Sequence, residues 1–155
     1  MISPTLFLAA VVAVAPPTSY TLLSLDRTSA NYLETESIRR SGDIVAAALV
    51  QLKAGTDLVL KTKTYNATRL ELAYDCRAGA SASLSLTFFR PDGTRIDEAD
   101  TVLPSDWRAV EDGSLNSEIR DIVCAPDPLR NREVRTDLGR LRRAYEQALA
   151  AGVVR

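Results

Sequence analysis

Cys76 and Cys124 have the clearest potential chemistry in this chain of 155 residues. Two cysteines can form either a redox-active dithiol or a structural disulfide. Catalytic dithiols usually lie two residues apart, and these two do not, which favours the structural bridge. An even cysteine count behind an apolar N-terminal stretch is typical of an exported domain. We therefore predict one Cys76–Cys124 disulfide in an oxidising compartment.

Carboxylates gather in two short stretches that could form a metal or acid–base site. They are Asp97, Glu98 and Asp100 in the first stretch, and Asp106, Glu111 and Asp112 around Trp107 in the second. The first stretch lies on a predicted hairpin strand, where solvent-facing side chains explain it more simply. Neither stretch has the spacing of an EF-hand calcium loop. We predict no catalytic, metal or cofactor site in either stretch.

The sequence contains no histidine. This excludes Ser-His-Asp and Cys-His catalysis as well as histidine-based zinc sites. Two cysteines are too few for a four-cysteine zinc or iron–sulfur site. The net charge of −1 gives no reason to expect a nucleic-acid partner. The composition favours a protein without enzymatic activity, although paired carboxylates leave a hydrolase as an alternative.

The N-terminal segment is apolar from Leu6 to Ala15. This stretch is too short to span a bilayer, and its length suits the central region of a secretory signal. Ala13 and Ala15 supply the small residues that precede a cleavage point. We predict that residues 1–15 are a signal peptide and that the mature chain is periplasmic or secreted, without a transmembrane segment or a lipid-anchor cysteine. The alternative is a buried first strand or helix in a cytosolic protein.

Period-two hydrophobicity predicts a consecutive antiparallel meander of about six strands. The cleanest alternation places Leu70, Leu72, Tyr74 and Cys76 on one face. The segments that match a strand pattern are residues 20–26, 31–38, 44–52, 58–65, 69–77, 84–90 and 94–102. Residues 91–93 read Pro-Asp-Gly, a strong hairpin signal before the last of these segments.

Two helices follow the strands. Ser114 can cap a short amphipathic helix that ends at Cys124. A longer amphipathic helix is predicted over residues 129–151. Its apolar stripe consists of Val134, Leu138, Leu141, Tyr145 and Leu149. The predicted fold class is α+β: an antiparallel sheet with a short disulfide-linked helix packed on it, followed by a longer helix.

Arginines make the last helix basic. They are Arg130, Arg132, Arg135, Arg140, Arg142 and Arg143. A basic helix can lie on an anionic membrane or bind an acidic partner. Interspersed carboxylates dilute this charge, so we expect a helix docked by its apolar stripe with a solvated basic face.

Several segments in order resemble a known family. They are NYLETESIRRSGDIV, LELAYDC, the PDG hairpin, DWRAV, the GS before the short helix, and the closing cysteine. Together they resemble the surface-adhesin protein E-like domain of Gram-negative bacteria. The resemblance implies a six-stranded antiparallel sheet with a helix on one face, export, and binding to host matrix or serum proteins.

These observations predict a signal peptide at residues 1–15, the adhesin-like domain at 20–125, and a C-terminal helix at 126–155. The expected function is an adhesin-like binding module for protein partners, with a homodimer through an exposed strand edge as a further candidate. The alternatives are a periplasmic small-molecule binder, a carboxylate-based hydrolase, or a structural envelope protein. A deep pocket with converging carboxylates would favour the small-molecule binder or the hydrolase, whereas a flat exposed sheet face with apolar or aromatic residues would favour the adhesin.

Overall fold

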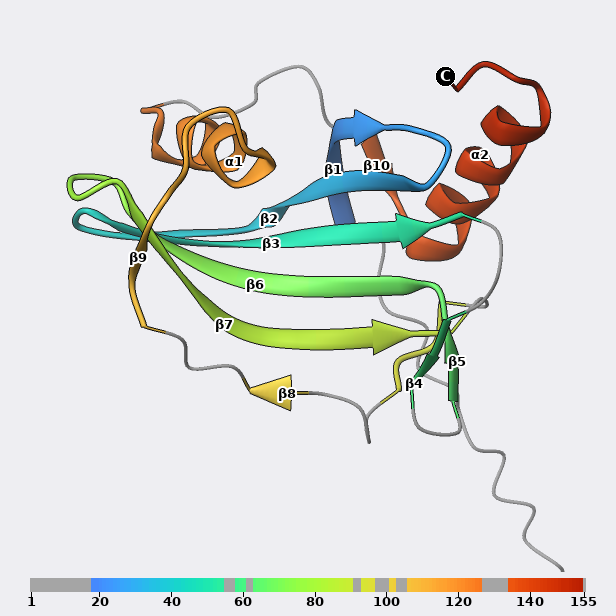
Figure 1. The fold of residues 1–155 in the computed structure, drawn as a ribbon, viewed down its shortest axis with the longest axis horizontal. Coiled ribbons are helices and arrows are strands. Elements are labelled where there is room, and N and C mark those ends of the chain that lie inside the picture. Colours follow the sequence, from blue (N-terminus) through green and yellow to red (C-terminus); the bar gives the residue numbers. More distant parts are fainter. Residues whose placement is uncertain are drawn as a thin grey trace, which may run out of the picture.

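A computed structural model describes residues 18–54, 58–60, 63–90, 93–96, 101–102, 106–126 and 134–154. Five strands of eight or more residues build the core of the fold (Figure 1). They are β1 (Thr18–Leu25), β2 (Ser29–Ser41), β3 (Ile44–Lys53), β6 (Ala67–Asp75) and β7 (Ala80–Phe89). Each of these strands pairs antiparallel with the next, so the predicted meander is present.

Three shorter strands extend the sheet at its two edges. They are β8 (Thr101–Val102), β9 (Arg108–Ala109) and β10 (Val134–Thr136). Among the described residues the order is β10-β1-β2-β3-β6-β7-β8, and β9 pairs with the beginning of β7. Within the described ranges the sheet therefore has eight strands, where the sequence predicted about six. The additional strands are too short for an alternating pattern to reveal them.

The predicted single strand over residues 58–65 is wrong. This segment forms a separate two-stranded hairpin of β4 (Leu58–Leu60) and β5 (Lys63–Tyr65). The hairpin is inserted between β3 and β6, which pair directly with each other. The returning strand predicted over residues 94–102 is present in part. Arg95 bridges to Phe89 and β8 pairs with β7, while Asp97, Glu98 and Asp100 lie outside the described residues.

The short helix forms where it was predicted. α1 (Leu115–Cys124) begins after Ser114, whose side chain accepts a hydrogen bond from the Ser117 N–H at 3.1 Å. This bond satisfies one of the N–H groups that the first turn of a helix leaves without a backbone partner.

The predicted start of the second helix at residue 129 is wrong. α2 (Leu138–Ala150) begins after Asp137, which accepts a hydrogen bond from the Arg140 N–H at 2.8 Å. The preceding residues form β10, which pairs with Thr18 to Tyr20 of β1. Val134, predicted on the helical stripe, is a strand residue that is 59% exposed. The open hydrogen-bonding edge of β1 favours this extended pairing over another turn of helix.

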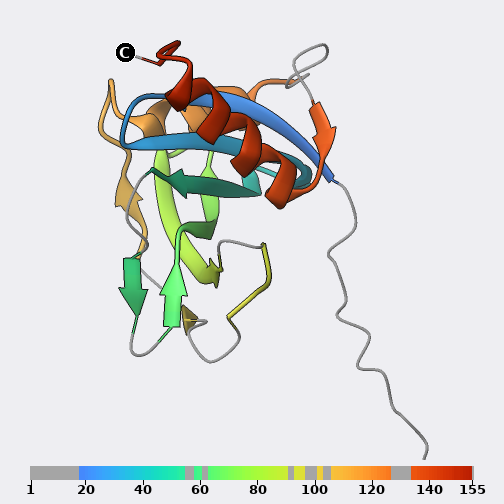
Figure 2. The same ribbon diagram turned by 90° about the vertical axis from the view of Figure 1, so that its right-hand side faces the viewer.

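The two helices cover different parts of the sheet (Figures 1 and 2). Consecutive strand residues point to opposite faces, and they divide the core accordingly. Leu49 packs against the cluster beneath α1, and its neighbour Val50 belongs to the cluster beneath α2. The α1 cluster consists of Leu33, Val45, Ala47, Leu72, Tyr74, Val110, Ile119 and Val123. The α2 cluster consists of Tyr20, Ala30, Tyr32, Val50, Leu52, Ala67, Leu141 and Tyr145.

Within the described residues, neither helix is long and apolar enough to cross a membrane.

Candidate binding surface

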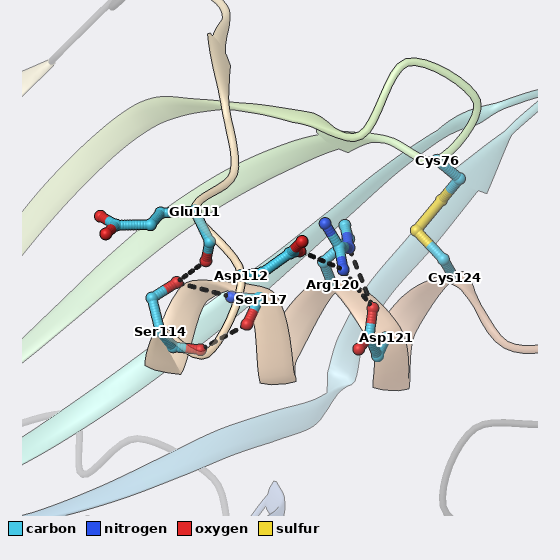
Figure 3. A network of polar contacts seen from close by, with 8 residues as sticks. All are labelled: Cys76, Glu111, Asp112, Ser114, Ser117, Arg120, Asp121 and Cys124. Carbon is cyan, nitrogen blue, oxygen red and sulfur yellow. Dashed lines mark hydrogen bonds and ion pairs between the residues drawn. A yellow bond between two sulfur atoms is a disulfide. The ribbon is translucent and has the colours of Figure 1, made fainter.

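A disulfide joins the C-terminal end of α1 to the sheet (Figure 3). Cys76 directly follows β6, Cys124 is the last residue of α1, and their Cα atoms are 5.6 Å apart. The guanidinium of Arg40 donates hydrogen bonds to the carbonyl oxygens of Val123 at 2.8 Å and Ala125 at 3.2 Å. The last carbonyls of a helix lack backbone donors, and Arg40 of β2 supplies donors to them at this end of α1.

The N-terminal end of α1 is fixed by its own loop (Figure 3). The Ser114 hydroxyl donates to the carbonyl oxygen of Glu111 at 2.6 Å, and the Ser117 hydroxyl donates to that of Ser114 at 2.8 Å. Arg120 contacts Asp121 at 2.8 Å and Asp112 at 3.7 Å. These bonds hold the turn before α1 in one geometry.

A buried tyrosine links the middle of the sheet to the first turn of α1. The Tyr74 hydroxyl donates to Asn116 Oδ1 at 2.6 Å, and Asn116 Nδ2 donates to the Ser81 hydroxyl at 2.9 Å. Tyr74 is fully buried, and burial raises the pKa of its hydroxyl, which therefore stays protonated as a donor. This chain of bonds sets the position of α1 over β6 and β7.

An open hollow of about 680 Å³ lies beside α1. Its apolar floor includes Leu49, Leu70, Leu72 and Ile119. Leu49 and Leu70 are only partly buried, because α1 does not cover them fully. Polar side chains surround this floor. They are Ser81, Ser83, Asp106, Arg108, Glu111, Ser114 and Asn116.

The structure separates the carboxylates that follow one another in the sequence. Asp106 and Glu111 lie at the rim of the hollow and are exposed, whereas Asp112 pairs with Arg120. In the part of the chain that the structure describes, no group of three or more metal-binding side chains converges. The rim therefore carries isolated charges of both signs, with Arg108 as its cation.

The described arginines of β10 and α2 largely pair with acidic side chains of the chain itself. The shortest contacts are Arg135 with Glu36 at 2.9 Å, Arg140 with Asp137 at 3.3 Å and Arg142 with Glu146 at 2.8 Å. Arg143 is exposed, and Arg130 and Arg132 lie outside the described residues. Leu141 and Tyr145 are buried against the sheet, as the predicted apolar stripe requires.

Sequence reasoning missed Arg40, Asn116 and Arg108. The first two act through hydrogen bonds between segments that are far apart in the chain, and no local pattern reports such bonds. Arg108 lies outside the segments that match a strand pattern, and its place at the rim depends on the pairing of β9 with β7.

The fold and this surface define a class of small α+β domains in which a disulfide fastens a helix to an antiparallel sheet. Residues 20–125 match the family model described as surface-adhesin protein E, and the chain belongs to this family. The match ends at residue 125, so β10 and α2 lie outside it.

Three solved structures of protein E from Haemophilus influenzae share the fold. One has 19% sequence identity and a TM-score of 0.53, over 71% of this chain and 89% of that chain. The selenomethionine form has 16% identity and a TM-score of 0.52, over 72% and 93%. The protein from a non-typeable strain has 16% identity and a TM-score of 0.50, over 82% and 88%. No curated protein matches the sequence.

Proposed function

We propose that this chain is an exported, non-enzymatic binding module that engages a protein partner through the hollow beside α1. The observation that carries the proposal is the apolar floor of the hollow, where Leu49 and Leu70 are only partly buried. Apolar side chains that a fold leaves partly open at a concave site are typical of binding surfaces. An apolar side chain of a partner would bury this floor, and the polar rim would surround the contact.

The rim favours a protein over a carboxylate-based hydrolysis site. Glycosidase-type hydrolysis needs two carboxyl groups that flank one bond, with one of them held protonated by its surroundings. Asp106 and Glu111 are exposed and share the rim with Arg108. Isolated charges of both signs around an apolar centre match the composition of protein–protein interfaces. Membership of the surface-adhesin family supports a host matrix or serum protein as the partner.

Binding can be tested with the mature chain on surfaces coated with basement-membrane extract or with serum proteins. We expect Leu70→Lys to weaken retention about tenfold or more, because it places a charge in the apolar floor. Leu84→Lys is the matched control, since Leu84 is 37% exposed on β7 and does not line the hollow. Arg108→Ala changes only the exposed rim and tests the same surface without disturbing the core. Equal retention of all three variants would contradict the proposal.

Export rests on the apolar leader and on the disulfide, since such bonds persist in oxidising compartments. We propose that residues 1–15 are removed as a signal peptide. Cell fractionation with N-terminal sequencing should find a mature chain outside the cytoplasm that begins near residue 16. Retention of the uncleaved N-terminus in the cytosol would overturn this proposal.

A homodimer is proposed through the outer edge of β1. β10 pairs only with Thr18 to Tyr20, so no described strand pairs with the remainder of this edge. Leu22 is 47% exposed and Leu25 is 38% exposed on the same strand. An open edge with apolar side chains is suited to pairing with a second copy. Light scattering should show a dimer that Leu22→Lys dissociates and Leu84→Lys does not; a monomeric wild-type chain at micromolar concentration would exclude it.

A further inference from the structure

We propose that a second site, between the sheet and the first turn of α2, binds a small organic cation with an apolar body. This cleft has a volume of about 370 Å³, within the range of small-molecule sites. Its walls come from β1, β2, β3, β6 and β7 together with Asp137 and Leu138. Since Asp137 and Leu138 lie outside the family match, the C-terminal extension completes this site.

Tyr20 presents an unused polar group in the cleft. Its side chain is 7% exposed, and its ring packs edge-on against Tyr32 with the ring centres 6.4 Å apart. Within the described residues the hydroxyl makes no hydrogen bond, although it belongs to a residue that lines the cleft. The oxygen is not one of the fully buried atoms of the described chain that lack a partner, so the hydroxyl is open to the cleft, where a ligand or water can bind it.

The Tyr20 hydroxyl also remains neutral. Burial and the nearby carboxylate of Glu34 raise the pKa of Tyr20 to about 12. A neutral phenol can accept a hydrogen bond from an ammonium group, and its ring can lie against an apolar ligand body. Phe89 supplies a second aromatic side chain in the same cleft.

The charges that line the cleft favour a cation. Three carboxylates, from Glu34, Glu36 and Asp137, accompany one guanidinium, from Arg69. Arg69 forms an ion pair with Glu34, in which Nε donates to Oε2 at 2.7 Å and Nη2 donates to Oε1 at 3.4 Å. Among the side chains that line the cleft, carboxylates therefore outnumber guanidiniums, and the one guanidinium is already paired.

The other two carboxylates form ion pairs that are screened by solvent. Glu36 contacts Arg135, which is 68% exposed, and Asp137 contacts Arg140, which is 72% exposed. Glu36 also accepts a hydrogen bond from the Ser19 hydroxyl at 3.0 Å, and Asp137 accepts one from the Arg140 N–H at 2.8 Å. Each carboxylate has acceptor capacity left for a further donor. Ion pairs at this exposure contribute little, so they compete weakly with a ligand. We infer that an ammonium group binds near Glu36 and Asp137 while its apolar part lies beside Tyr20 and Phe89. Cation–π attraction to the rings adds to this contact.

The test uses three probes of similar shape and different charge: 2-phenylethylamine, phenylacetate and 2-phenylethanol. Calorimetric titration into the mature full-length chain should show saturable binding of the amine and at least about tenfold weaker binding of the other two. Tyr20→Phe should weaken amine binding about tenfold, because it removes the hydroxyl and keeps the ring. Tyr32→Phe is the matched control, since it deletes a hydroxyl from the neighbouring ring, which does not line the cleft.

Asp137→Asn provides a second variant, because it removes the charge and keeps the oxygen that caps α2. It should weaken amine binding to a similar degree. No saturable binding of the amine, tighter binding of phenylacetate, or equal losses in Tyr20→Phe and Tyr32→Phe would each overturn the proposal. Leu70→Lys should leave amine binding unchanged, so the result is independent of the hollow beside α1.

Discussion

The two helices are attached to the same sheet in similar ways, with one difference. Each begins at a short polar cap, Ser114 for α1 and Asp137 for α2. Each also has one tyrosine hydroxyl bond to the rest of the fold. Tyr74 bonds to Asn116 of α1, and Tyr145 of α2 bonds to the carbonyl oxygen of Asp26 at 2.8 Å.

The difference lies in how the chain next to each helix is joined to the sheet. The disulfide and Arg40 fix the last turn of α1, whereas α2 is preceded by the three-residue strand β10. A covalent link near a binding surface keeps its geometry constant, while an element held by noncovalent contacts alone can open locally at lower free energy. The hollow beside α1 is therefore the more rigid site, and the cleft beside α2 is the more adaptable one.

Among the changes that test this comparison, removal of the disulfide should lower the free energy of unfolding most. The bond closes a loop between residues separated by 48 positions, and the chain-entropy model gives about 4 kcal/mol for such a loop. Denaturant unfolding of Cys76→Ala/Cys124→Ala should show a loss of this order. Addition of a reductant to the wild-type chain should have the same effect. An unchanged midpoint would mean that packing alone fixes α1.

Truncation of one buried side chain in each helix should have the next largest effect on stability. Ile119→Ala and Leu141→Ala each delete a buried branched side chain, and each should cost about 3 kcal/mol. We expect hydrogen exchange to separate them. Leu141→Ala should speed exchange mainly in α2, because that helix can open by itself, whereas Ile119→Ala should speed it across the sheet. The same exchange pattern in both variants would remove the distinction between the helices.

Removal of the tyrosine hydroxyls should have a smaller effect on stability, and the effect should differ between the two helices. Tyr74→Phe leaves Asn116 Oδ1 without its donor in a partly buried setting and should cost about 2 kcal/mol. Tyr145→Phe frees a carbonyl at the exposed residue Asp26, where water can replace the hydroxyl, so we expect about 0.5 kcal/mol. Chemical denaturation of both variants measures the difference. A larger loss in Tyr145→Phe would reverse the order.

The turn beneath α2 should give the smallest effect, and it should depend on pH. Asp26 accepts hydrogen bonds from the Thr28 hydroxyl, the Thr28 N–H and the Ser29 N–H, and these bonds lower the pKa of Asp26. Its stabilisation is therefore present above its unfolded pKa of 3.8 and is lost as the pH falls through the lower folded pKa. Thermal unfolding should find Asp26→Ala less stable than wild type at pH 7 and equal to it in strong acid. A difference that persists in strong acid would contradict this assignment.

The central meander could be predicted because its information is local. Alternation placed Leu70, Leu72 and Tyr74 on one face, and Ser114 marked the start of α1. The start of α2 could not be predicted in the same way. Val134 fits the helical spacing of Leu138 and Leu141, and only the open edge of β1, more than a hundred residues earlier, makes it a strand residue.

The sites were harder to predict than the fold. Sequence periodicity identified the leucines of the hollow as core residues, but it could not show that a ten-residue helix leaves Leu49 and Leu70 half covered. The cleft depends on the pairing of Tyr20 with Glu34 across β1 and β2, and on Asp137 from the far end of the chain. Both sites result from long-range packing, which the sequence pattern does not record.

The most direct test of the central claim is a hydrogen-exchange footprint of this chain in complex with a matrix or serum protein that it retains. The partner is purified from the coated-surface experiment, and exchange is compared with and without it. We predict protection of peptides that contain Leu70 and residues 106–119, and unchanged exchange over α2. Protection confined to α2 or to the edge of β1, with the hollow unprotected, would contradict the assignment of the hollow as the binding surface.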